Sequence, residues 1–173
     1  MKDWPLVSFG FVNVERIAYL KSCFESFFEC TKSYPNREFL VVDNHSIYEE
    51  KEITDYLVEL KSRGVKVHRT DKRNPNNEFA LGCNWIVDNS SGDFVIPLQG
   101  DMQCILKGDW LQRYVEFYSE HLHEVGCMML DAQRTITNKS HKFLSPNDGK
   151  YKFVYDISRP PLNAACDVMY SRQ

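Results

Sequence analysis

The chain has 173 residues, of which 43% are hydrophobic and 26% are charged, and its formal net charge is −3. These values fit one globular domain with a substantial core and exclude a disordered chain. The net charge gives no support to a nucleic-acid-binding surface. No apolar run approaches the roughly 20 residues that cross a bilayer, and the N-terminus lacks the apolar segment of a signal peptide, so we expect a cytoplasmic location.

Short apolar runs alternate with amphipathic segments through most of the chain. The apolar runs predict strands over residues 6–12, 39–42, 65–68 and 94–98. Apolar residues at helical spacing predict helices over 16–30, from Ser46 to Arg63, over 79–89 and from Asp109 onwards. Ser46 and Glu49 have the spacing of a capping box, and Asp109 can cap the fourth helix. The inner side of the third helix is expected to carry Phe79, Cys83, Ile86 and Val87.

The pattern weakens after the fourth helix. Residues 125–130 predict another strand, 135–150 a polar loop, and 151–157 and 164–170 two further strands. The alternation of strands and helices up to residue 130 predicts an α/β fold with a largely parallel sheet flanked by helices.

Six cysteines are spread through the chain without a CxxC pair: Cys23, Cys30, Cys83, Cys104, Cys127 and Cys166. Zinc sites and redox motifs usually contain close pairs, so both are disfavoured. In a reducing compartment such cysteines are most often small buried apolar residues, and we expect that role here.

Two of the predicted strands end in an acidic turn. Residues 39–42 run into DNHS at 43–46, and residues 94–98 run into QGD at 99–101. In open α/β sheets, ligands bind just beyond the carboxyl ends of the strands. Two carboxylates at two such ends therefore predict one polar site at one edge of the sheet.

Four stretches resemble, in order and spacing, the motifs of a known enzyme family: RIAYLKSCFES (16–26), VVDNHS (41–46), NNEFALGCN (76–84) and GDFVIPLQGDM (92–102). They are similar to R-x-x-Y-L-x-x-C-L-x-S, V-V-D-N-G-S, N-x-G-F-A-x-G-C-N and G-D-Y-(apolar)-L-D-D-D of GT-A glycosyltransferases, specifically the inverting family 2. The resemblance implies one Rossmann-like GT-A domain over residues 1–173. Within it, 1–105 would bind the nucleotide sugar, and 106–173 would begin an acceptor-side part that is truncated.

The resemblance implies a nucleotide-sugar donor, most readily a UDP-sugar, and a glycan, lipid or protein as acceptor. It places these residues in the donor site: Val12, Asn13, Asp43, Asn44, Ser46, Asn84, Gln99 and Gly100. Asp43 would accept hydrogen bonds from the base or the ribose. Asp101, the last position of the D-x-D motif, would hold Mn²⁺ or Mg²⁺ against the diphosphate. Taken alone, Asp43 also fits a plain turn before a capped helix, and Asp101 an exposed Gly-Asp turn.

The chain departs from the family pattern at several positions. Gln99 stands where the family has the first D-x-D carboxylate, which weakens the inference of a metal, although its amide can still bond the ribose. Glu78 replaces the usual Gly, and NVE at 13–15 replaces the usual Tyr-Asn. Asn13 can still face the base from its place after the first strand. Asn84 matches a family residue near the donor, but a packing role on the helix explains it equally well.

An inverting transfer needs a base that deprotonates the acceptor hydroxyl. In the resembled family this base follows the D-x-D motif at a distance that this chain does not reach, so the catalytic residue is unknown. Asp156 and Asp167 are the remaining late carboxylates. The main hypothesis is a metal-assisted, inverting glycosyltransferase of the hexosyl type. The alternatives are a non-catalytic nucleotide-sugar-binding module and the donor-binding half of a longer enzyme. A nucleotidyltransferase is disfavoured, because no phosphate loop rich in Gly and Arg or Lys follows the first strand.

Overall fold

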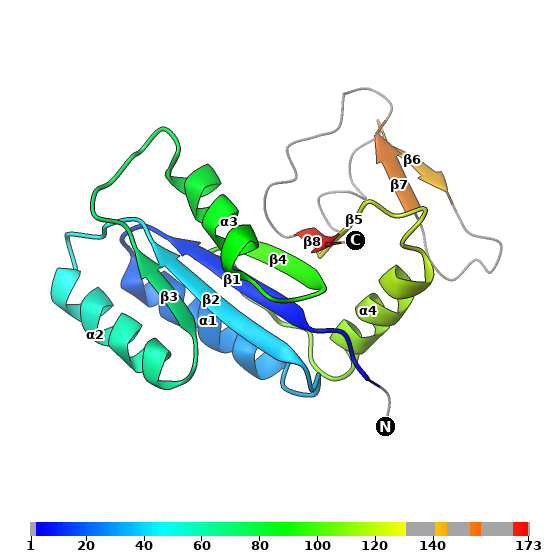
Figure 1. Ribbon diagram of the computed structural model, residues 1–173, viewed down its shortest axis with the longest axis horizontal. Helices are drawn as coiled ribbons and strands as arrows, with labels where there is room; N and C mark the ends of the chain where they lie inside the picture. The colour runs from blue at the N-terminus through cyan, green and yellow to red at the C-terminus, as the bar shows by residue number, and fades with distance from the viewer. Residues whose placement is uncertain (1–2, 131–140, 145–152, 157–167, 173) are drawn as a thin grey trace.

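The computed structural model describes residues 3–130, 141–144, 153–156 and 168–172. Its central element is a six-stranded sheet with the strand order β3-β2-β1-β4-β8-β5 (Figure 1). These strands are β1 (Val7–Asn13), β2 (Arg37–Asp43), β3 (Lys66–Arg69), β4 (Phe94–Gln99), β5 (Cys127–Met129) and β8 (Val168–Ser171). A separate antiparallel pair joins β6 (His141–Leu144) to β7 (Phe153–Asp156).

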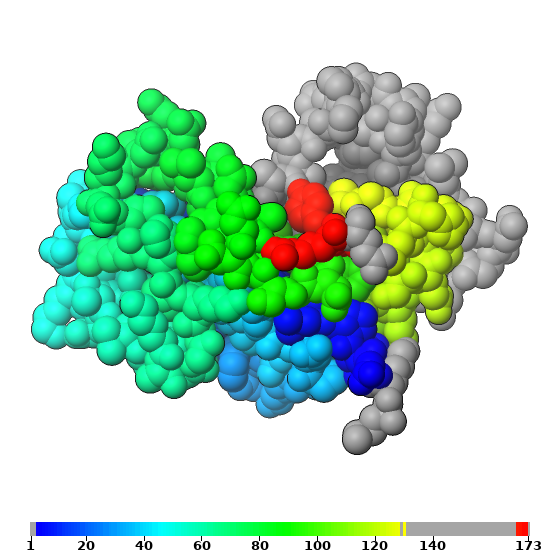
Figure 2. All heavy atoms as spheres, in the orientation of Figure 1, coloured from blue at the N-terminus to red at the C-terminus, as the bar shows by residue number. Residues whose placement is uncertain are grey.

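The sheet has a parallel part and an antiparallel part. Strands β1 to β4 run parallel, whereas β8 is antiparallel to β4 and β5 is antiparallel to β8. The β8 residues, red in Figure 2, lie between the green segment that contains β4 and the yellow segment that contains β5. The predicted α/β fold with a mostly parallel sheet is therefore confirmed, and the antiparallel strands are confined to one side.

Helices cover both faces of the parallel strands, which explains why these strands are continuous apolar runs. The helices are α1 (Ile17–Cys30), α2 (Glu50–Ser62), α3 (Glu78–Asn89) and α4 (Trp110–Glu120). One face packs Phe9, Phe11 and Val41 against α1, α2 and α4. The other face packs Val12 and Val42 against α3. Figure 1 views the sheet from the side of this helix. Neighbouring strand residues thus alternate between two cores.

Two glycines let α3 lie unusually close to β1. A Cβ atom on Gly10 would stand 2.2 Å from Cγ2 of Ile86, and one on Gly82 would stand 2.7 Å from Cγ1 of Val12. Such overlaps force neighbouring groups to shift and destabilise a packed core. The close contact fixes the first turn of α3, with Glu78, beside the end of β1.

Several local expectations were wrong. The second helix does not begin at Ser46: α2 begins at Glu50, and its N-cap residue Glu49 makes no side-chain cap hydrogen bond. Asp109 does precede α4, but its carboxylate pairs with Arg113 and does not cap the helix. Val87 does not line the inner side of α3, because the sheet-facing line of that helix passes through Gly82 and Ile86 and leaves Val87 44% exposed.

The expectations for the later part and for the cysteines held in part. Strand β6 lies within the stretch expected to be a loop, because its backbone pairs with β7. Cys23 and Cys30 are buried as expected, whereas Cys83 and Cys104 are half-buried and Cys127 is exposed. Cys166 lies outside the described residues. In the described part of the chain, no helix combines the length and apolarity that a membrane crossing requires.

Candidate functional site

The carboxyl ends of β1, β2 and β4 meet at one edge of the sheet, where ligands bind in open α/β folds. The strand register pairs Asn13 with Asp43 and Val12 with Gln99. A hollow of about 200 Å³ opens there. Six predicted site residues line it: Val12, Asn13, Asn44, Gln99, Gly100 and Asp101. Sequence reasoning therefore located this edge of the sheet and most of the wall of the hollow.

The other predicted residues lie elsewhere. Asp43 and Ser46 are buried behind the wall, with exposed fractions of 0% and 1%. Asn84 is exposed on α3 and is not part of the lining. Asp156 belongs to the separate strand β7, and Asp167 lies outside the described residues.

The Asp43 carboxylate is surrounded by donors. Its Oδ1 accepts hydrogen bonds from Asn13 Nδ2 at 3.0 Å and from the Ser46 hydroxyl. Its Oδ2 accepts the Ser46 N–H at 3.1 Å and lies 3.2 Å from Nε of Arg69. An ionised carboxylate offers about four acceptor positions. Three hydrogen bonds and the ion pair with Arg69 therefore occupy most of its capacity. Because the amide nitrogen of Asn13 is held by Asp43, its oxygen is the atom left for other contacts.

Asn44 lies beside this carboxylate with an exposed fraction of only 2%. Its backbone N–H donates to the carbonyl of Asn13 at 2.8 Å. Its side-chain Nδ2, however, has no hydrogen-bond partner among the residues that the structure describes. A buried donor without a partner is costly, and such groups usually have a partner such as a ligand or an ordered water.

Two loops next to the hollow are tied together by their acidic side chains. The Glu15 carboxylate accepts the N–H groups of Ile47 and Tyr48, each at 3.0 Å. In return, Glu49 Oε2 accepts the N–H of Ile17 at the start of α1, also at 3.0 Å. Glu49 thus caps α1, a helix far from it in sequence, although its spacing from Ser46 had suggested a role at its own helix.

This connection holds the backbone in an uncommon conformation. Glu15, Arg16 and His45 have φ angles of 54°, 53° and 56°, in the left-handed region. For residues other than Gly this region is strained, and such residues cluster at functional sites. The Ser46 hydroxyl also accepts the Glu15 N–H at 2.6 Å. The backbone of Arg16, just after the end of β1, is therefore held in place beside the hollow.

The turn after β4 is more open. Gln99 and Asp101 are exposed, whereas Gly100 is buried and donates its N–H to the carbonyl of Val12 at 2.9 Å. Asp101 Oδ2 lies 3.5 Å from Nη1 of Arg16. The guanidinium carbon of Arg16 lies 5.5 Å from the ring centroid of Tyr19, over an exposed ring.

Three small side chains of α1 hold the loop that carries Asp101. Cys23 Sγ donates to the Gln99 carbonyl at 3.5 Å, and Cys30 Sγ donates to the Cys104 carbonyl at 3.4 Å. The Ser26 hydroxyl accepts the Cys104 N–H at 2.9 Å. Burial raises the pKa of the Cys23 thiol to about 12, so it remains protonated and able to donate. These contacts give a structural reason for the cysteine and serine of the first motif.

The oxygen atoms in the hollow suit a hard divalent cation only in part. Asp101 supplies one carboxylate, and Gln99 supplies an amide at the position where the family motif has a second carboxylate. Glu78, the other carboxylate in the lining, is paired with Arg73 at 3.0 Å. The described ranges hold no group of three or more His, Cys, Asp or Glu suited to a metal. Since Mg²⁺ commonly takes one or two carboxylates plus substrate phosphates, the residues fit a metal that the ligand helps to hold.

A protein-family model described as "Glycosyl transferase family 2" matches residues 11–172. The chain belongs to glycosyl transferase family 2. This membership confirms the family predicted from the motifs and supports a role in glycosyl transfer. None of the curated proteins compared with this family member matches its sequence.

Several solved structures share its fold. One is TarS residues 1–349 from S. aureus, with 18% identity and a TM-score of 0.56 over 72% of this chain and 34% of that one. A complex of the same TarS fragment with UDP-GlcNAc has 15% identity and a TM-score of 0.56, covering 81% and 40%. The mannosyltransferase PcManGT from Pyrobaculum calidifontis, in complex with GDP-Man and Mn²⁺, has 18% identity and a TM-score of 0.56, covering 73% and 35%. The chain thus spans 34–40% of the length of these structures.

Sequence reasoning missed part of the wall of this family 2 site. Val14, Arg16, Tyr19, Glu78 and Phe79 also line the hollow. Arg16 and Tyr19 belong to the first motif, and Glu78 is a departure from the third. Nothing in the sequence, however, indicated that these three residues line the hollow. Their positions follow from the left-handed turn after β1 and from the close packing of α3.

Proposed function

We propose that this chain binds a nucleotide-diphosphate sugar and takes part in transferring the sugar, with inversion, to an acceptor hydroxyl of a glycan, lipid or protein. The observation that carries the proposal is the hollow at the ends of β1, β2 and β4, lined by six of the residues that the resemblance to the family had indicated. The TarS complex named above contains UDP-GlcNAc and the mannosyltransferase complex contains GDP-Man, which supports a nucleotide-sugar donor. Among donors, we favour a UDP-sugar.

The nucleoside end of the donor is assigned to the buried turn after β2, which contains Asp43, Asn44 and Ser46. Asp43 is buried, accepts three hydrogen bonds from Asn13 and Ser46, and forms an ion pair with Arg69, so we infer that it acts by orienting Asn13 and Ser46. Asn13 and Asn44 then present their amides to the base or the ribose. An unpartnered Nδ2 on Asn44 supports this assignment, because a ligand acceptor would satisfy it.

The diphosphate end is assigned to the open turn after β4. Asp101 would hold Mn²⁺ or Mg²⁺ together with the donor's phosphates, and the Gln99 amide would contact the ribose. When bound, such a metal neutralises the charge that develops on the departing diphosphate. Mn²⁺ in the mannosyltransferase complex is consistent with this assignment.

We also propose how the domain is divided and which residues could supply the catalytic base. Residues 1–105 would form the donor-binding part and 106–173 the beginning of an acceptor-side part of one domain. Asp156 and Asp167 remain the predicted candidates for the base, and a cytoplasmic location remains our expectation. Gln99 in place of a carboxylate favours one rival, a binding module without turnover.

Calorimetric titration tests the proposal. The intact chain should bind UDP or GDP and their sugars, more tightly with Mn²⁺ than without it. Asp101→Ala should abolish the metal-dependent gain and should not weaken metal-free binding. Asp109→Ala, which removes an exposed carboxylate at the start of α4, is the matched control. If no nucleotide binds under any condition, the donor site does not exist. Binding without hydrolysis or transfer of the sugar would favour the binding module.

A further inference from the structure

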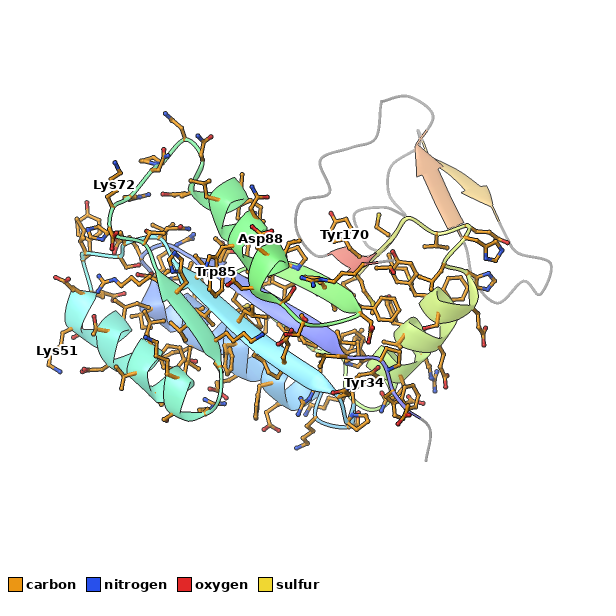
Figure 3. All side chains as sticks on the ribbon, viewed as in Figure 1. Tyr34, Lys51, Lys72, Trp85, Asp88 and Tyr170 are labelled. Carbon is orange, nitrogen blue, oxygen red and sulfur yellow. The ribbon has the colours of Figure 1, made fainter. Side chains whose placement is uncertain are left out.

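The hollow contains a cation that neither the motifs nor the metal assignment used. Arg16 is the only Lys or Arg in the lining, as far as the described residues go. Lys51 and Lys72, in contrast, extend from the outer surface of the molecule (Figure 3). Because the hollow is proposed to receive a diphosphate, the single positive charge of its lining is a candidate to bind that anion.

We propose that Arg16 pairs with Asp101 in the empty site and moves to the diphosphate when the donor binds, so that Asp101 binds the metal more readily when the diphosphate is present. This inference rests on the proposed function, because the incoming anion is the donor's own diphosphate. Arg16 would then bind the donor's diphosphate and, when the donor is absent, weaken the binding of the metal at Asp101.

The placement of Arg16 supports an exchange of partners. Its backbone is held in the left-handed region, between Glu15, which is tied to the loop at Ile47, and Ile17, which is capped by Glu49. The backbone therefore stays in place while the long side chain remains free to move. That side chain is 58% exposed and rests over the exposed ring of Tyr19, a flat surface on which a guanidinium can shift at small cost.

The contact between Arg16 and Asp101 is weak enough to be exchanged. The atoms Nη1 and Oδ2 are 3.5 Å apart, and the Asp101 side chain is 37% exposed. Ion pairs of this kind contribute little stability. A diphosphate offers several charged oxygens in a geometry that the planar guanidinium binds bidentately, which makes it the stronger partner.

The exchange couples the metal to the nucleotide. While Arg16 lies beside Asp101, a divalent cation at that carboxylate must compete with a second positive charge. Once the guanidinium has moved to the diphosphate, the carboxylate and the phosphate oxygens can share the cation. Because coupling between two ligands is reciprocal, UDP should tighten Mn²⁺ binding by the same factor by which Mn²⁺ tightens UDP binding. Removing Arg16 takes away the competitor of Mn²⁺ and the partner of the diphosphate, so it should change the affinity for each ligand taken alone.

Arg16→Gln separates the two halves of the proposal in binding measurements without turnover. Electron paramagnetic resonance with Mn²⁺ alone should show tighter binding to the variant, by up to about fivefold, the usual limit for an exposed ion pair. Calorimetry without metal should show UDP bound at least about tenfold more weakly, as expected for lost hydrogen bonds to a charged group. Uridine should bind within about twofold of wild type, because it has no phosphate.

Two further variants control the experiment. Arg113→Gln removes an arginine that is paired with Asp109 on α4, away from the hollow, and should change none of the three affinities. Arg16→Lys keeps the charge without the planar fork, so it should restore the low affinity for Mn²⁺ alone and only part of the affinity for UDP.

The outcomes are distinct. Equal losses for uridine and UDP in Arg16→Gln would show that Arg16 merely supports the hollow, and unchanged affinities for Mn²⁺ and UDP would also overturn the proposal. Wild type that binds UDP no better than uridine would also overturn the proposal, because the diphosphate would then add no affinity. If wild type binds GDP but neither UDP nor uridine, the same series is run with GDP and guanosine. If wild type binds no nucleotide at all, the proposed function fails and the diphosphate half fails with it. The pairing with Asp101 is then judged by Mn²⁺ alone.

Discussion

The turns after β2 and β4 end at the same edge of the sheet, yet they are built in opposite ways. In the first, the Asp43 carboxylate is completely buried and meets donors from β1, from β3 and from its own turn. In the second, the Asp101 carboxylate is partly exposed and lies 3.5 Å from the exposed guanidinium of Arg16. The first turn therefore maintains the shape of the site, and the second has the freedom to exchange partners.

The comparison is tested most severely at Asp43. Asp43→Ala leaves Arg69 and the Asn13 amide without their buried acceptor, which should lower the free energy of unfolding by about 3–5 kcal/mol. Urea denaturation monitored by circular dichroism measures this change. Nucleotide binding should be lost as a consequence. A variant that unfolds like wild type but no longer binds nucleotide would show instead that Asp43 contacts the ligand directly.

Ser26→Ala tests whether α1 fixes the open turn. The variant leaves the Cys104 N–H without its acceptor, which should cost about 1–3 kcal/mol of unfolding free energy. Amide hydrogen exchange at Cys104 should become faster, and the metal-dependent part of UDP binding should weaken. Ser22→Ala, which changes an exposed residue one turn earlier on the same helix, is the control and should behave as wild type. An unchanged exchange rate at Cys104 would contradict the claim that Ser26 holds this loop through its hydrogen bond to the Cys104 N–H.

Asp101→Ala should have the smallest effect on stability. Because the carboxylate is partly exposed and its ion pair is weak, unfolding free energy should stay within about 0.5 kcal/mol of wild type. The same denaturation measurement that detects Asp43→Ala serves here. A loss as large as that of Asp43→Ala would remove the distinction between a closed and an open turn.

Much of the parallel half of the fold was predictable, because local signals and tertiary contacts agree there. The apolar runs that became β1, β2 and β4 are buried on both faces, and the helices between them present apolar stripes. The antiparallel part was less predictable. One of the two partners of β8 in the sheet is β4, which is far away in sequence. Strand β6 lies in a polar stretch whose pairing with β7 no local pattern reveals.

The site was predictable in composition but not in its internal contacts. The motifs placed Asn13, Gln99 and Asp101 around one hollow. They did not reveal that Asp43 would be enclosed, because one of the groups that enclose it, Arg69, comes from a neighbouring strand. Glu49 shows the same limitation: its spacing from Ser46 is that of a capping box, yet its hydrogen bond goes to the first turn of α1.

The position of β8 has a consequence for the order in which the sheet is assembled. Strand β5 comes earlier in the chain than β8, but it lies outside β8 and pairs with the sheet only through it. β8 is itself anchored on both sides: the Arg172 N–H donates to the Asp93 carbonyl, and the Ser171 N–H donates to the Tyr118 hydroxyl. The nascent parallel half can therefore form first, whereas β5 must wait for a segment synthesised after it. Until that segment arrives, the edge of β4 is available to other strands, which makes this the step at which folding competes with aggregation.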